Sequence, residues 1–150
     1  MLIIGNFLYV VNTDGVSRFP YQPGATKITG AGQRILALPA SGYNHHWTRN
    51  LLASPAGSKI YVTVGSGSNV QENGSVNEIR CANTIQVNPG GSGEKVFSSG
   101  LRNPVGLGWA PGTTTLWTAV NERDELVPDY LTSVKEGGFY GWPHAYYGPN

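Results

Sequence analysis

The chain has 150 residues, of which 21 are glycine and 10 are proline. Charged residues make up 13%, against about 25% in an average domain, and ten Lys plus Arg against nine Asp plus Glu leave a net charge of +1. This balance argues against a nucleic-acid-binding surface, and no apolar run approaches the ~18 residues that suggest a membrane span. The single cysteine, Cys81, excludes an intramolecular disulfide framework and a cysteine-based metal site.

Short runs rich in β-branched and aromatic residues predict β-strands along the chain. The strongest candidates, each preceded by a turn that contains glycine, are residues 8–11, 59–64 and 115–120. Weaker candidates are residues 16–19, 34–38, 84–87 and 95–97. Because no apolar face with helical spacing extends beyond a turn or two, the sequence predicts an all-β fold.

An internal repeat is visible when the sequence is shifted by 56 residues. Residues 51–55 then fall on 107–111, and residues 60–64 fall on 116–120. A fainter third copy begins at Leu8, which lies 52 positions before Ile60. A period in the fifties, with about four strands in each unit, is typical of a β-propeller blade.

The repeat predicts blade-like units at roughly 1–45, 46–101 and 102–150, each a four-stranded antiparallel sheet. Propellers close with about 4–8 blades, so a chain of this length corresponds to about two and a half blades of a larger propeller. The unpaired strand edges of such a fragment favour association between copies of the chain.

The same shift superposes His46 on Arg102 and Trp47 on Asn103. Both pairs precede the first strand of their unit, where a propeller faces its central channel, so we expect polar side chains to converge there. An imidazole, with a reference pKa of about 6.5, suits removal of a proton from a substrate hydroxyl, and it equally suits a structural role against loop carbonyls. Since neighbouring strand residues point to opposite faces, His45 and His46 are not expected to ligate one metal ion.

Three other segments carry distinctive chemistry. The guanidinium of Arg102 is a planar fork that can bind carboxylates, and the amide of Asn103 can both donate and accept hydrogen bonds. Alternatively, the two residues form a turn with the arginine in solvent. Residues 121–125 include three carboxylates, which suits either Ca²⁺ binding or a solvated loop. Residues 137–143 combine glycine with aromatic residues and predict a tight structural turn, and residues 87–93 predict a hairpin tip.

Five stretches carry a resemblance to a known family: residues 45–51, 61–66, 99–107, 121–125 and 127–143. Together they resemble the sorbosone dehydrogenase branch of the soluble PQQ-dependent aldose dehydrogenases. The resemblance implies a six-bladed β-propeller, pyrroloquinoline quinone (PQQ) and Ca²⁺ as cofactors, and a sugar or sugar aldehyde as substrate. It also implies export to the periplasm, although the opening MLIIG is too short for a signal-peptide core.

The resemblance assigns roles to particular residues. His46 matches the histidine that removes the substrate hydroxyl proton during hydride transfer to the quinone. Arg102 and Asn103 match the pair that contacts the carboxylates and quinone oxygens of the cofactor. Ser66 stands where related glucose dehydrogenases have an aspartate that orients the histidine, and a hydroxyl is expected to stabilise an imidazolium less well than a carboxylate.

The resemblance also places the Ca²⁺ ligands. Backbone carbonyls in the region of Asn121 and Glu122 match the pair that holds the calcium ion of the cofactor. Tyr140 falls where those relatives place a ligand of a structural calcium ion.

Two other functions stay open from the sequence. Axial His, Asn and carboxylate groups also occur in calcium-dependent propeller lactonases and esterases, which would make the chain a hydrolase, although no Gly-x-Ser-x-Gly elbow occurs. A non-catalytic binding or assembly module, built on exposed blade edges, is the third hypothesis.

Overall fold

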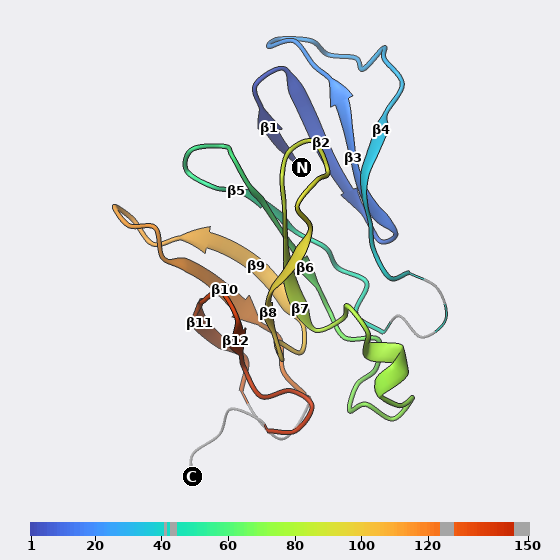
Figure 1. Cartoon of the computed structure of the whole chain (residues 1–150), viewed down its shortest axis with the longest axis vertical. Coiled ribbons are helices and arrows are strands. Elements are labelled where there is room, and N and C mark those ends of the chain that lie inside the picture. Colours follow the sequence, from blue (N-terminus) through green and yellow to red (C-terminus); the bar gives the residue numbers. More distant parts are fainter. Residues whose placement is uncertain (41, 43–44, 124–127, 146–150) are drawn as a thin grey trace.

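The computed structural model describes residues 1–40, 42, 45–123 and 128–145. These residues form twelve β-strands and one short 3-10 helix, and the strands make three sheets that follow one another along the chain (Figure 1). The predicted all-β fold is therefore confirmed. The predicted four strands per sheet hold for the first sheet only, because among the described residues the second sheet has five strands and the third has three. In the described part of the chain, no helix is long and apolar enough to cross a membrane.

Each sheet is built mainly from consecutive antiparallel strands. The first has the order β1 (Leu2–Ile4), β2 (Phe7–Asn12), β3 (Gly15–Pro20) and β4 (Gln33–Ala37). The second contains β5 (Leu51–Ala53), β6 (Ile60–Val64), β7 (Asn83–Val87) and β8 (Lys95–Ser99), and β12 (Gly138–Phe139) pairs parallel to β8. The third contains β9 (Pro104–Trp109), β10 (Leu116–Val120) and β11 (Tyr130–Val134). The helix η1 (Ser75–Glu78) lies in the connection from β6 to β7.

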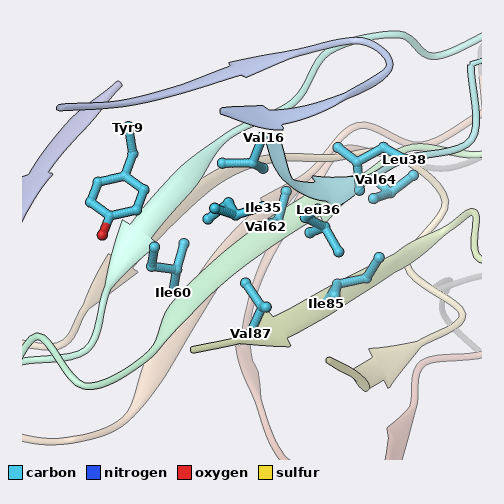
Figure 2. Packing of buried hydrophobic residues seen from close by; sticks show 10 residues of the cluster. All are labelled: Tyr9, Val16, Ile35, Leu36, Leu38, Ile60, Val62, Val64, Ile85 and Val87. Carbon is cyan, nitrogen blue, oxygen red and sulfur yellow. The ribbon is translucent and has the colours of Figure 1, made fainter. Parts of the chain in front are cut away.

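The second sheet is buried on both faces because it lies between the other two. All five residues of β6 are buried, as are all five of β7. Alternate residues of a strand point to opposite faces, so one face of β6 presents Ile60, Val62 and Val64 to the first sheet. There they pack with residues that include Tyr9 and Val16 (Figure 2).

The opposite face of the second sheet packs against the third sheet. Tyr61 and Phe97 join Leu116 and Val120 in this second core. The ring of Tyr61 makes edge contacts with Phe97 and Trp109, at centroid distances of 5.0 and 5.4 Å. Such edge-to-face pairs stabilise a core beyond the area they bury.

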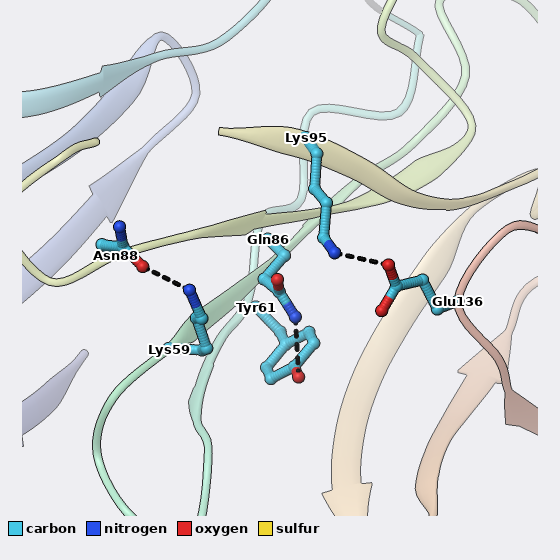
Figure 3. A network of polar contacts seen from close by, with 6 residues as sticks. All are labelled: Lys59, Tyr61, Gln86, Asn88, Lys95 and Glu136. Atoms are coloured by element: carbon cyan, nitrogen blue, oxygen red, sulfur yellow. Dashed lines mark hydrogen bonds and ion pairs between the residues drawn. The ribbon is translucent and has the colours of Figure 1, made fainter. Parts of the chain in front are cut away.

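Polar contacts tie the strands together beside this core (Figure 3). Gln86 Nε2 donates a hydrogen bond to the hydroxyl of Tyr61 at 2.9 Å, which satisfies two buried polar groups. Lys95 pairs with Glu136 across the β8 edge. Because this ion pair is largely exposed, it contributes little to stability.

Candidate active site

Four connections between strands meet at one end of the sheets, and backbone hydrogen bonds join each to the next. The amide of His46 donates to the carbonyl of Ser66, and the amide of Ser66 donates to the carbonyl of Arg102. The amide of Asn121 in turn donates to the carbonyl of Asn103. The structure therefore brings four loop segments together. Two of them, which contain His46 and Arg102, are superposed by the shift of 56 residues, and the other two follow β6 and β10.

His46 is held by Ser66 through its ring nitrogen Nδ1. This atom lies 2.7 Å from the hydroxyl oxygen of Ser66 and 3.2 Å from its carbonyl oxygen. The hydroxyl of Ser66 already donates its proton to the carbonyl of Ser68, at 2.7 Å. Both groups that face Nδ1 are therefore acceptors, so Nδ1 must carry the proton and Nε2 of the neutral ring must carry the lone pair.

The loop that follows β6 is fixed by a second set of contacts. The carboxylate of Glu78, in η1, accepts hydrogen bonds from the backbone amide of Gly67, at 2.8 Å, and from the hydroxyl of Ser68. Ser66 is fully buried in this loop. The position of the histidine ring is thus connected through Ser66 and Ser68 to a carboxylate further along the chain.

Gly65 allows His46 and Asn103 to approach one another. A methyl group at this glycine would lie 2.5 Å from Cβ of His46 and 2.6 Å from Oδ1 of Asn103, closer than real contacts allow. The backbone of Gly65 is not in the left-handed region, so the requirement is for space and not for an unusual φ. Asn103 is 6% exposed, and its Oδ1 has no hydrogen-bond partner, although its Nδ2 donates to Asn121 Oδ1 at 3.3 Å.

Arg102 is buried, with 2% of its surface exposed, so the alternative of a turn with the arginine in solvent is wrong. Its Nε donates to the carbonyl of Asn69 at 3.0 Å, and its Nη2 donates to the side chain of the same residue. Nη1 donates to the carbonyls of Asn121 and Glu122, at 3.1 and 2.7 Å. The guanidinium therefore joins the loop after β6 to the loop after β10.

This arrangement bears on the predicted calcium ligands. Backbone carbonyls are suitable ligands for Ca²⁺, and those of Asn121 and Glu122 do converge. A positively charged nitrogen of Arg102 already lies against both oxygens. As arranged here, the pair does not fit a calcium ion, because the ion would meet the guanidinium charge at close range.

The side chain of Glu122 is 3% exposed, and its Oε2 has no hydrogen-bond partner. Burial raises the pKa of this carboxyl, and the guanidinium of Arg102 acts in the opposite direction. The backbone amide of Glu122 donates to Asp129 at 2.9 Å. The alternative of a solvated loop therefore does not hold for Glu122; Asp124 and Glu125 lie outside the described residues.

Tyr140 and His45, which the sequence analysis also discussed, make contacts that it did not predict. The hydroxyl of Tyr140 donates to the carbonyl of Ser133 at 2.7 Å and accepts from the amide of Lys135 at 2.8 Å, so it fixes the turn after β11. His45 and His46 were expected to point to opposite faces of a strand, but they lie in a loop. Their rings touch edge to face, at a centroid distance of 4.6 Å. Among the described residues, no group of three or more His, Cys, Asp or Glu side chains could hold a metal ion.

Sequence reasoning did not assign Gly65, Asn69 or Glu78 to the site. The run Gly65-Ser66-Gly67-Ser68 directly after a buried strand is a local signal for such a loop. Nothing in the sequence indicates that Glu78, eleven residues after Gly67, returns to bind it.

Comparisons with known proteins identify similar chains. A segment of 60 residues is 35% identical to the aldose sugar dehydrogenase YliI of Escherichia coli K12, covering 40% of this chain and 16% of that protein. A calcium structure of the carbohydrate-active enzyme family AA12 protein of Trichoderma reesei matches with a TM-score of 0.77 and 19% identity, covering 93% of this chain and 41% of that one. The holo PQQ domain of pyranose dehydrogenase from Coprinopsis cinerea matches with a TM-score of 0.63 and 17% identity, covering 87% and 34%.

The structural likenesses show the propeller fold, and the chain spans about two fifths or less of the length of these known proteins. The family model described as TrAA12-like matches residues 2–137, which is most of the chain. This chain, part of a β-propeller of the sugar dehydrogenase type, therefore belongs to the TrAA12-like family.

Proposed function

We propose that this chain carries one wall of a site that oxidises an aldose or sugar aldehyde with PQQ as the electron acceptor, and that His46 is its general base. The YliI protein is named an aldose sugar dehydrogenase, and the Coprinopsis cinerea domain is named a PQQ domain. Those names, with the family match, support a sugar as the substrate and PQQ as the cofactor. The known proteins are longer, so the remainder of the site belongs to further blades.

The contacts of Nδ1 of His46 with Ser66 are the observation that carries this proposal. Donation from Nδ1 to Ser66 leaves the lone pair on Nε2. Nε2 takes the proton of the substrate hydroxyl, and the electrons of the O–H bond form the new carbonyl bond as hydride leaves the same carbon. A bound quinone would supply the two-electron oxidant that this hydride requires.

Asn103 is the residue that fits a polar cofactor or substrate group beside His46. Its Oδ1 is buried without a partner, next to the histidine across Gly65. A buried unpaired oxygen is costly, and a donor from a bound ligand would remove that cost. Arg102 instead positions the loops after β6 and β10, because its guanidinium donates hydrogen bonds to the carbonyls of Asn69, Asn121 and Glu122.

Anaerobic titration of the chain with PQQ, with and without Ca²⁺, tests cofactor binding through the visible spectrum of the quinone. Dye-linked oxidation of aldoses then tests catalysis in wild type, His46→Gln and His45→Gln. We expect His46→Gln to bind PQQ and to lose activity by about 10²–10⁴-fold, the usual contribution of a general base. The neighbouring His45→Gln is the matched control and should retain activity.

An unchanged quinone spectrum would overturn cofactor binding by this chain. Activity of His46→Gln equal to that of wild type would overturn the role of His46. Turnover of a lactone or p-nitrophenyl ester without PQQ would instead favour the hydrolase alternative.

A further inference from the structure

Residues 66–68 form a short segment between the loop that carries His46 and the helix η1. The amides of His45 and His46 donate hydrogen bonds to the carbonyls of Gly67 and Ser66, each at 3.1 Å. The hydroxyl of Ser66 adds a contact to Nδ1 of the His46 ring, at 2.7 Å. The backbone and one side chain of the segment therefore fasten it to the histidine loop.

Glu78 holds the same segment from η1. Its carboxylate accepts hydrogen bonds from the amide of Gly67, at 2.8 Å, and from the hydroxyl of Ser68. Ser66 and Ser68 are fully buried, so their hydroxyls depend on protein partners. Since hydrogen bonds to a carboxylate are stronger than those between neutral groups, Glu78 anchors the segment firmly on this side.

The contacts between Glu78 and the histidine ring act through position and not through proton transfer. The hydroxyl of Ser66 donates to the backbone carbonyl of Ser68, at 2.7 Å, whereas Glu78 accepts from the side chain of Ser68. A peptide carbonyl has no proton to pass on, so the series is not a continuous path for protons. What Glu78 fixes is the place of the Ser68 carbonyl, and that carbonyl decides where the hydroxyl of Ser66 points.

We propose that Glu78 is a positioning residue for His46, because it holds residues 66–68 so that the hydroxyl of Ser66 meets Nδ1 as an acceptor. The inference rests on the proposed function, in which Nε2 of His46 takes the substrate proton. Without Glu78, two donors of the segment lose their acceptor and the Ser68 carbonyl is able to move. The hydroxyl of Ser66 can then turn its proton towards Nδ1, which puts the ring proton on Nε2 and removes the lone pair there.

A second carboxylate in the same connection provides a matched control. Glu72 accepts hydrogen bonds from the amides of Asn69 and Val70, at 3.1 and 2.7 Å. Like Glu78, it binds two donors of the connection from β6 to β7, but its donors lie outside residues 66–68. Loss of Glu72 therefore loosens this connection by the same number of hydrogen bonds without releasing that segment.

Nitrogen-15 NMR of the His46 ring tests the proposal in the chain itself, without cofactor or substrate. At a pH where the ring is neutral, we expect wild type to carry its proton on Nδ1. In Glu78→Ala, exchange of this proton with water should be about 5–30-fold faster, the factor for the loss of one or two ordinary hydrogen bonds, and the ring shifts should move towards the Nε2–H form. Glu78→Gln keeps one acceptor oxygen and should lie between the two, and Glu72→Ala should match wild type.

Exchange in Glu78→Ala as slow as in wild type, or an equal acceleration in Glu72→Ala, would overturn the positioning role. Where Glu78→Ala does not fold, Glu78→Gln carries the test, and exchange unchanged from wild type would count against the proposal. The activity of His46→Gln separates this result from the proposed function. Lost activity there with unchanged exchange in the Glu78 variants excludes Glu78 alone, whereas full activity with fast exchange removes the catalytic role of the histidine that Glu78 holds.

Discussion

Nδ1 of His46 lies 2.7 Å from the hydroxyl of Ser66, and that hydroxyl donates its own proton to the carbonyl of Ser68. The direction of this chain of hydrogen bonds determines which nitrogen of the imidazole can act as a base. The sequence led us to expect that a serine would stabilise an imidazolium less well than the aspartate of related enzymes. The structure adds that the serine still selects the tautomer, without placing a negative charge beside the ring.

Replacing Ser66 with alanine should weaken this selection. The longer contact from Nδ1 to the carbonyl of Ser66, at 3.2 Å, would remain. One hydrogen bond of about 1 kcal/mol is lost, so the ratio of the two tautomers should shift about fivefold towards Nε2–H. The nitrogen-15 shifts of the His46 ring report this ratio directly. Ser54→Ala, at a partly exposed hydroxyl remote from the site, should leave the ring shifts unchanged, and an unaltered ratio in Ser66→Ala would show that the carbonyl alone sets the tautomer.

A methyl group at Gly65 should separate His46 from Asn103. Because the added atom would lie 2.5 Å from Cβ of His46 and 2.9 Å from its carbonyl oxygen, the loop must move. We expect Gly65→Ala to lower the free energy of unfolding by about 1–3 kcal/mol, as overpacking usually does. The substitution should also weaken the binding of any ligand that contacts both His46 and Asn103. Gly90→Ala is the control, since nothing lies within 4 Å of the added atom. Equal stability of the two variants in urea denaturation would contradict the close packing at Gly65.

Seven of the twelve strands in the described part of the chain could be predicted from the sequence, because their physical causes are local. Runs such as 59–64 are strongly β-forming and are bounded by turn residues, and the structure contains a strand at every predicted place. The repeat also indicated which residues precede equivalent strands. His46 and Asn103 do meet at Gly65, although the shift of 56 aligns His46 with Arg102 and not with Asn103.

The contacts of the site could not be predicted, because they depend on the path of a long loop. Arg102 was expected either to bind a carboxylate ligand or to lie in solvent. Its burial follows from the position of Asn69, in the loop between β6 and β7, which carries two of its acceptors. The composition of that loop does not reveal the path, since Gln71, Arg80 and Ala82 adopt positive φ without being glycine.

Replacing Arg102 with methionine should destabilise the chain strongly. The substitution keeps a long side chain but leaves the carbonyls of Asn69, Asn121 and Glu122 without their charged donor. An unsatisfied buried group costs about 1–3 kcal/mol, so we expect a loss of about 3 kcal/mol or more in the free energy of unfolding. Arg34→Met is the control, because the ion pair of Arg34 with Asp14 is half exposed and contributes at most about 1 kcal/mol. Similar losses for both variants in urea denaturation would show that Arg102 does not join the loops.

Glu122 should make the stability of the chain depend on pH. Burial raises the pKa of this carboxyl above its unfolded value, and the nearby Asp129 acts in the same direction, while Arg102 opposes both. Between the unfolded and the raised folded pKa, the native state binds more protons than the unfolded state, so the free energy of unfolding falls as the pH rises through this window. Glu122→Gln cannot ionise and should remove this part of the slope, which makes the variant progressively more stable relative to wild type as the pH rises from the unfolded pKa, about 4.3, through the raised folded pKa. Urea denaturation of both proteins across that range measures the difference between their free energies of unfolding, and the contributions of other carboxyls cancel in this difference. A difference that does not change with pH would mean that the carboxyl of Glu122 keeps its ordinary pKa in the folded chain.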